Sequence, residues 1–219
     1  MRHKLLALLI VCALFAGCGS TETVPPEETE TAENAEAEDT TETALEETEE
    51  NFLEEEADTH ILVAYFSATG NTAPLAEYAA EILAADLYEI EPLEIYTSDD
   101  LDYGNSSSRT SLEQNDADCR PELKESGLDL SVYDTIIIAH PIWWGKAPRL
   151  ICTFLESYDF AGKTMVSFCT SASSGLGDSA EELRALLPES VNWLESRRFA
   201  IGTDKDEISA WLQEIGLQQ

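Results

Sequence analysis

The chain has 219 residues and a formal net charge of −32 at pH 7, because 44 acidic residues face only 12 lysines and arginines. Such an acidic surface repels phosphate, which argues against nucleic acid and anionic membrane surfaces as partners. The five cysteines are few and scattered, which argues against a disulfide scaffold.

The N-terminus has the pattern of a secretory signal peptide. Arg2 and Lys4 precede an apolar run over residues 5–16 that is too short to span a bilayer comfortably as a permanent helix. The run from Leu14 to Cys18 resembles a bacterial lipoprotein signal. This resemblance implies that residues 1–17 are removed and that a lipidated Cys18 anchors the protein to the extracytoplasmic face of the cell membrane. An ordinary signal peptide or an uncleaved anchor is the alternative interpretation.

Residues 18–58 have a different composition. From residue 19 onward the segment holds 17 acidic residues, eight threonines, one aromatic residue and no lysine or arginine. It cannot bury enough apolar surface to offset its ordering entropy, so we expect a disordered acidic tether. Binding of a metal ion or a basic partner is the alternative, but a solvated stalk explains the composition more simply.

The remaining residues, 59–219, have the length of one domain and a net charge near −17, from 27 acidic and 10 basic residues. Apolar periodicity predicts strands at 61–66, 87–91, 133–139, 163–170 and 191–201. It predicts helices at 74–85, 148–157, 178–187 and 205–217. Strands that alternate with helices indicate an α/β fold, a parallel sheet with helices on both faces.

Residues 92–130 interrupt this alternation. The segment is rich in serine, aspartate and asparagine and has no clear period, apart from a short helix expected at 111–116. Long excursions inside compact domains are often lids or walls of a functional site.

Three loops should meet at the carboxyl ends of the strands, where ligands bind in sheets of this kind. They are residues 67–72, 140–148 and 170–177. The first carries Ser67, Thr69, Asn71 and Thr72 around Gly70 and leads into a helix. Hydroxyl and backbone donors at a helix N-terminus suit one phosphate group, although these residues are also ordinary helix caps.

The second loop places Trp143 and Trp144 in an expected turn, where aromatic side chains can stack on a flat heteroaromatic ring. The alternative is that they plug the sheet edge, and we expect one tryptophan in the core and the other at the ligand. His140 is a candidate proton donor, but a capped or core role is favoured. The third loop is small and glycine-rich, so its backbone N–H groups can approach a ligand.

The three loops together resemble those of flavodoxins. The run Ser67-Ala68-Thr69-Gly70-Asn71-Thr72 is similar to the flavodoxin phosphate loop, which typically reads Thr/Ser-x-Thr-Gly-Asn-Thr. A bacterial flavodoxin-like branch with a PxWWG loop is matched by three further groups of residues. These are Pro141-Ile142-Trp143-Trp144-Gly145 with Pro148, Phe168-Cys169-Thr170 with Gly175-Leu176-Gly177, and Arg120-Pro121.

This resemblance implies a five-stranded parallel sheet of order 2-1-3-4-5 and FMN as the cofactor. The first loop would hold the FMN phosphate, and the other two would flank the isoalloxazine. The expected FMN ligands are Ser67, Thr69, Gly70, Asn71, Thr72, Pro141, Ile142, Trp143, Trp144, Gly145, Thr170, Ser171, Ala172, Ser173 and Gly175. The branch often has His-Gly-Gly where this chain has Ser171-Ala172-Ser173, so no catalytic role is carried over. We assign no catalytic side chain and no metal site.

The sequence therefore predicts an FMN-binding electron-transfer lipoprotein that shuttles electrons between redox partner proteins or quinone-type small molecules at the cell envelope. The enzyme alternative is an FMN-dependent NAD(P)H:quinone or flavin reductase, with residues 92–130 as a substrate wall. Arg109 or Arg120 would then meet the nucleotide phosphate, although an ion pair explains either arginine more simply. A third possibility is a binding module that has kept the fold without the cofactor.

Overall fold

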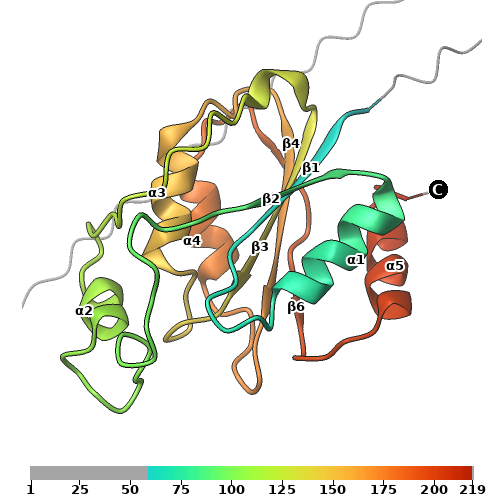
Figure 1. Ribbon diagram of the computed structural model, residues 1–219. Coiled ribbons are helices and arrows are strands. Elements are labelled where there is room, and N and C mark those ends of the chain that lie inside the picture. The colour runs from blue at the N-terminus through green and yellow to red at the C-terminus, as the bar shows by residue number, and fades with distance from the viewer. Residues whose placement is uncertain (1–58, 219) are drawn as a thin grey trace, which may run out of the picture. The chain divides into compact units, whose positions relative to one another are not determined.

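A parallel sheet organises residues 59–218, which the computed structural model describes (Figure 1). The strands are β1 (Ile61–Tyr65), β2 (Asp86–Glu89), β3 (Thr135–Pro141), β4 (Thr164–Thr170), β5 (Asn192–Trp193) and β6 (Arg197–Phe199). They follow the order β2-β1-β3-β4-β5, with β6 also paired to β4, and every pair is parallel. The expected α/β class and strand order are confirmed. The predicted signal peptide, the lipidation of Cys18 and the tether lie outside the described residues.

The last strand differs from the prediction of one continuous strand over 191–201. Two short strands pair with opposite ends of β4, Asn192 and Trp193 with its start and Arg197–Phe199 with its end. Between them the Ser196 hydroxyl contacts the Ser167 amide at 3.4 Å and the Ser167 hydroxyl at 3.1 Å. The Ser196 side chain therefore takes the place of the backbone hydrogen bonds between the strands at this point. Such an interruption cannot be predicted from the hydrophobic period of the sequence.

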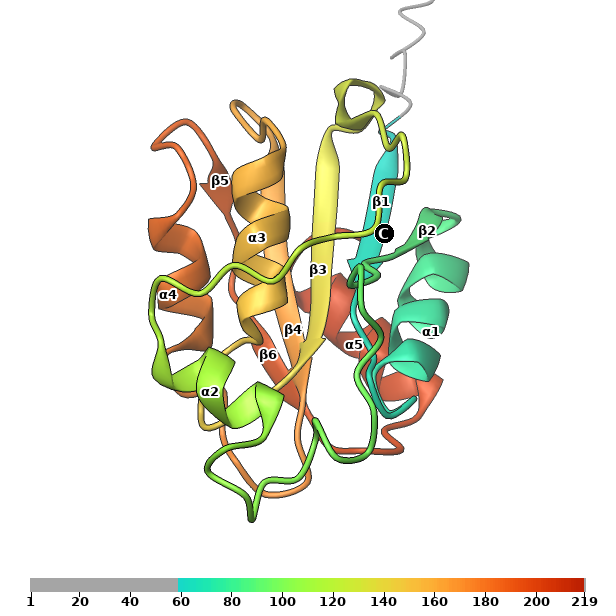
Figure 2. The ribbon, with the colours of Figure 1, turned by 60° about the vertical axis from the view of Figure 1, so that its left-hand side comes forward.

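Helices cover both faces of the sheet (Figure 2). Helices α1 (Ala73–Leu83) and α5 (Lys205–Glu214) lie on one face, and α3 (Arg149–Ser157) and α4 (Ser179–Ala185) lie on the other. All four were predicted with starts within one residue, and three of them with C-terminal ends two or three residues too long. Among residues 59–218, no helix has both the length and the apolar content needed to cross a bilayer.

The core is divided by the sheet into two layers. Ile136 and Ile138 of β3 belong to one hydrophobic cluster, and Ile137 and Ala139 belong to the other. This strand is buried on both faces, which accounts for its uninterrupted apolar run.

The excursion between β2 and β3 is more ordered than its composition suggested. It contains α2 (Arg109–Asn115) and a 3₁₀ turn, η1 (Leu130–Val132). The expected short helix is present and begins two residues earlier, because Ser108 caps it by accepting the amide of Ser111. Helix α2 lies near the carboxyl ends of the strands in both views (Figures 1 and 2).

Candidate functional site

The carboxyl ends of β1, β3 and β4 meet in register. Tyr65 pairs with Ala139, and the ladder continues to Pro141 opposite Thr170. The loops that follow enclose a cavity of about 420 Å³, which is in the size range of cofactor sites. Most of the predicted FMN ligands line it, namely Thr69, Asn71, Pro141, Ile142, Trp143, Thr170, Ser171, Ala172 and Ser173. The structure therefore brings together the three loops that the sequence singled out.

Two residues of the first loop hold the loop itself. The Ser67 hydroxyl oxygen accepts the amides of Thr72 and Ala73, at 3.0 and 3.1 Å, and so satisfies two backbone donors at the start of helix α1. Thr72 is only 1% exposed, and its hydroxyl lies 2.8 Å from the Thr170 hydroxyl, which ties the first loop to the end of β4. The hydroxyls of Ser67 and Thr72 therefore stabilise the conformation of the first loop.

The donors that remain in this loop suit an anion. Thr69 and Asn71 line the cavity and are joined by a hydrogen bond of 2.9 Å from the asparagine amide to the threonine hydroxyl. Gly70 between them has a φ of 77°, a left-handed conformation that glycine adopts without strain. The loop contains no acidic side chain and ends at the N-terminus of an 11-residue helix. This donor set fits the phosphate of a mononucleotide.

The second loop is a tight hairpin turn. Trp143 and Lys146 exchange backbone hydrogen bonds of 2.9 and 3.0 Å. Trp144 and Gly145 between them have φ values of 49° and 79°, as in a type I′ turn. A left-handed conformation costs a residue with a Cβ about 1–2 kcal/mol. Strain of this kind gathers at functional sites.

The two tryptophans of this turn have different surroundings. One of them lies in the core, as expected, whereas the placement of the other at the ligand stays a prediction. Trp143 is 3% exposed and packs edge-to-face against Phe66 and Tyr96, with centroids 5.6 and 5.3 Å apart. Trp144 is 43% exposed, and its ring lies 4.6 Å from that of Tyr103 at 35°. Trp143 is thus a core residue that also forms part of the cavity wall, whereas Trp144 lies at the surface.

The third loop packs against the second. Gly177 has a φ of 57°, and a Cβ added there would collide with the carbonyl oxygen of Gly145. Lys146 and Glu182 of α4 form an ion pair across the same junction. At Gly177 the absence of a side chain therefore permits contact between two loops, and this residue does not serve the approach to a ligand that the sequence suggested for this loop. Gly175 lies nearby without a close neighbour.

Four residues that line the cavity were not among the expected ligands. Ala68 and Ser174 lie within the predicted loops, whereas Tyr103 and Ile201 lie outside them. Tyr103 comes from the excursion between β2 and β3, and Ile201 follows β6. The one available signal for Tyr103 is a lone aromatic residue among turn formers, since Asp102, Gly104 and Asn105 surround it. Tyr103 is 55% exposed, and the burial of the remainder raises the pKa of its hydroxyl.

Residues 60–215 match the model of the flavodoxin family. The chain belongs to the flavodoxin family. It is 46% identical to a flavoprotein from Bacteroides eggerthii, with a TM-score of 0.67 over 72% of this chain and 98% of that chain. A flavoprotein from Bacteroides uniformis is 44% identical, with a TM-score of 0.68 over 71% and 98%. A flavoprotein from Lactobacillus acidophilus in complex with FMN is 26% identical, with a TM-score of 0.54 over 70% and 98%. No protein with a curated description matches the chain.

The wall of this flavodoxin cavity carries no formal charge. Within the described residues, no lysine, arginine, histidine, aspartate or glutamate lines it. Arg198 is a nearby cation, and it binds the carbonyl oxygen of Ser171 and so fixes the third loop from behind. The cavity is therefore built from hydroxyls, amides, aliphatic groups and aromatic rings.

The candidate proton donor of the flavodoxin domain is a core residue. His140 is fully buried, its Nδ1 lies 3.0 Å from the carbonyl oxygen of Pro141, and its Nε2 has no partner among the described residues. Burial lowers its pKa to about 4, so the imidazole is neutral at pH 7. The favoured core interpretation is confirmed.

The two arginines considered for a nucleotide phosphate are engaged elsewhere. Arg109 pairs with Glu113 and Arg120 with Glu156, both at 2.7 Å. The ion-pair interpretation of both residues is confirmed.

Proposed function

We propose that the protein is an FMN-binding electron-transfer flavodoxin of the branch with the PxWWG loop, anchored to the cell envelope through a lipidated Cys18. Family membership supports a redox flavoprotein, and the FMN complex of the Lactobacillus acidophilus protein supports FMN as the cofactor. When bound, FMN supplies the redox chemistry, and the protein supplies its position and surroundings.

The observation that carries the proposal is the cavity where the ends of β1, β3 and β4 meet. Its first loop offers uncharged donors at the start of α1, which would hold the phosphate. The loops after β3 and β4 provide an apolar and aromatic wall with Trp143, where the isoalloxazine would lie. Tyr103, which lies in the segment between β2 and β3, would contribute a further part of the cavity wall.

The chemistry of the wall supports a carrier over a reductase. Tyr103 is the one titratable side chain that lines the cavity among the described residues, and its raised pKa makes it a poor acid or base near pH 7. Within residues 59–218, no cation that would bind the phosphate of a nicotinamide nucleotide lines the wall. Transfer of electrons alone needs neither group.

The proposed partners and the proposed location of the protein are supported by its sequence. The lipoprotein-like signal and the acidic tether support attachment to the outer face of the cell membrane by the lipid alone. The reach of the tether would allow the domain to meet redox partner proteins or quinone-type small molecules. The acidic charge supports exclusion of nucleic acid.

Two measurements on the purified full-length protein test the function. An absorbance spectrum with and without added FMN is expected to show bound flavin, whereas a colourless protein that takes up no FMN indicates a binding module. Steady-state oxidation of NADH and NADPH by the FMN-loaded protein is expected to be slow, and rapid turnover would instead identify a reductase.

The anchor is tested separately. A Cys18→Ser variant expressed in a bacterium is expected to leave the membrane fraction, because a lipid chain can no longer be attached. Retention of the variant in that fraction would contradict lipidation at Cys18.

A further inference from the structure

Gln114 of α2 contacts the backbone on both sides of the tryptophan-containing turn. Its Nε2 donates to the carbonyl oxygens of Trp143 and Ala147, at 2.9 and 3.2 Å, and its Oε1 accepts the amide of Arg149 at 3.2 Å. Two acceptors and one donor fix the orientation of the side-chain amide. Gln114 is 8% exposed, so these bonds form in a buried setting where an unpaired polar group is costly.

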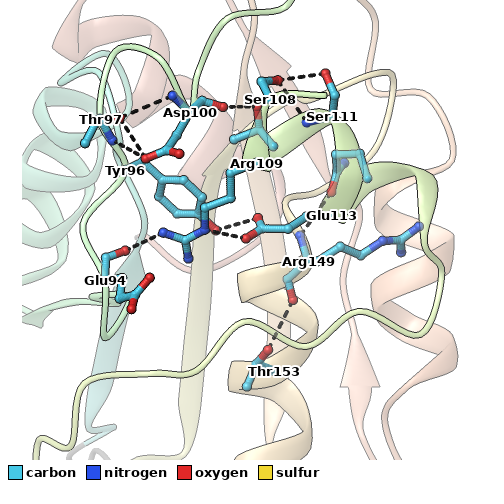
Figure 3. A network of polar contacts seen from close by, with 12 residues as sticks. Glu94, Tyr96, Thr97, Asp100, Ser108, Arg109, Ser111, Glu113, Arg149 and Thr153 are labelled. Carbon is cyan, nitrogen blue, oxygen red and sulfur yellow. Dashed lines mark hydrogen bonds and ion pairs between the residues drawn. The ribbon is translucent and has the colours of Figure 1, made fainter. Parts of the chain in front are cut away.

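Helix α2 is itself held in place by a network of polar contacts (Figure 3). Glu113 accepts hydrogen bonds of 2.7 Å from both Tyr96 and Arg109, and the Arg109 guanidinium lies 4.1 Å from the centroid of the Tyr96 ring. The Tyr96 ring in turn packs against Trp143. The helix that carries Gln114 is therefore braced against the same tryptophan that Gln114 contacts through the backbone.

We propose that Gln114 is a positioning residue for FMN. Its side chain holds the turn between Trp143 and Ala147 in the shape that forms the cavity wall. The inference rests on the proposed function and deepens it. Trp144 holds a left-handed conformation within this turn. A strained turn keeps its shape only while its surroundings enforce it. Of the side chains within residues 59–218 that line or brace the wall, Gln114 is the one that bonds to both ends of the turn.

The test uses Gln114→Met in the full-length protein, because methionine has a similar length and helix propensity but forms none of the three bonds. Asn115→Met is the matched control, since Asn115 is the exposed amide next to it on the same helix. FMN affinity is measured by fluorescence titration, and visible circular dichroism of FMN is recorded at saturation. Amide hydrogen exchange of Trp143 and Lys146 is measured without FMN.

Gln114→Met is expected to lower FMN affinity about tenfold or more, since one net hydrogen bond corresponds to about that factor. It is also expected to change the visible circular dichroism and to speed exchange of both amides, while Asn115→Met stays within about twofold of the wild type. If Gln114→Met does not fold, Gln114→Glu replaces it, because the carboxylate keeps the bond from Arg149 and loses both donors.

A folded Gln114 variant with wild-type affinity and an unchanged dichroism signal overturns the inference, as does an equal loss in Asn115→Met. A wild-type protein that binds no FMN overturns the proposed function instead. In that case the exchange of the Trp143 and Lys146 amides still shows whether Gln114 holds the turn.

Discussion

Replacing Gly177 by alanine tests whether the cavity depends on the contact between its second and third loops. Gly177 has a φ of 57°, and an added Cβ meets the backbone carbonyl of Gly145, which has no flexible end that could move aside. Gly175, two residues earlier, has no positive φ and no atom within 4 Å of an added Cβ. The same substitution there is a matched control.

The expected magnitude follows from two contributions. The left-handed conformation costs alanine about 1–2 kcal/mol, and displacement of packed backbone adds roughly 1–3 kcal/mol. Gly177→Ala should therefore lower the free energy of unfolding by about 2–5 kcal/mol, a large share of the roughly 5–15 kcal/mol of a typical domain. Gly175→Ala should be neutral or stabilising by about 0.4–1 kcal/mol, because alanine restricts the unfolded chain.

Urea unfolding of both variants without FMN measures this difference, with an unchanged slope as the sign that the native state is comparable. FMN affinity should fall in Gly177→Ala as well, because a displaced Gly145 shifts the turn that begins at Trp143, a residue of the cavity wall. Equal unfolding free energies for the two alanine variants would refute the argument that the loops touch at Gly177.

Three further predictions concern single side chains. Thr69→Ala combined with Thr72→Ala should weaken FMN binding about tenfold or more, since one hydroxyl lines the cavity and the other ties the loop to Thr170. Undiminished affinity in a folded double variant would place the phosphate elsewhere. Tyr103→Ala should lower FMN affinity several-fold, because a ring contact contributes roughly 0.5–1.5 kcal/mol, and an unchanged titration would remove Tyr103 from the site. Burial lowers the pKa of His140 from 6.5 to about 4, so its neutral form contributes stability that is fully present above about pH 6.5 and is lost as the pH falls to 4. Between pH 7 and 4 the wild type should lose about 3 kcal/mol more unfolding free energy than His140→Leu, and equal losses in urea unfolding would contradict the burial argument.

The local sequence of this domain predicts its strands, its helices and the loops of its site. A β-branched run such as that of β3 has the period of a doubly buried strand, and alternation with helices leads to a parallel sheet. In such a sheet the loops after β1, β3 and β4 emerge at one edge. The position of the cavity therefore followed from the order of elements, and its uncharged donors could be identified before any contact was known.

Other features depend on partners far away along the chain, which no local pattern records. Ser196 interrupts the last strand because it contacts Ser167, and Thr72 turns inward because it meets Thr170. Tyr103 and Gln114 lie in a segment without periodicity, and packing alone brings them to the turn that holds Trp143 and Trp144. The sequence by itself determined the fold class and the loops that form the site, and its resemblance to flavodoxins implied the strand order. Only the tertiary structure decided which side chains face the cavity and which hold it in place, because those roles depend on contacts between segments that are remote in sequence.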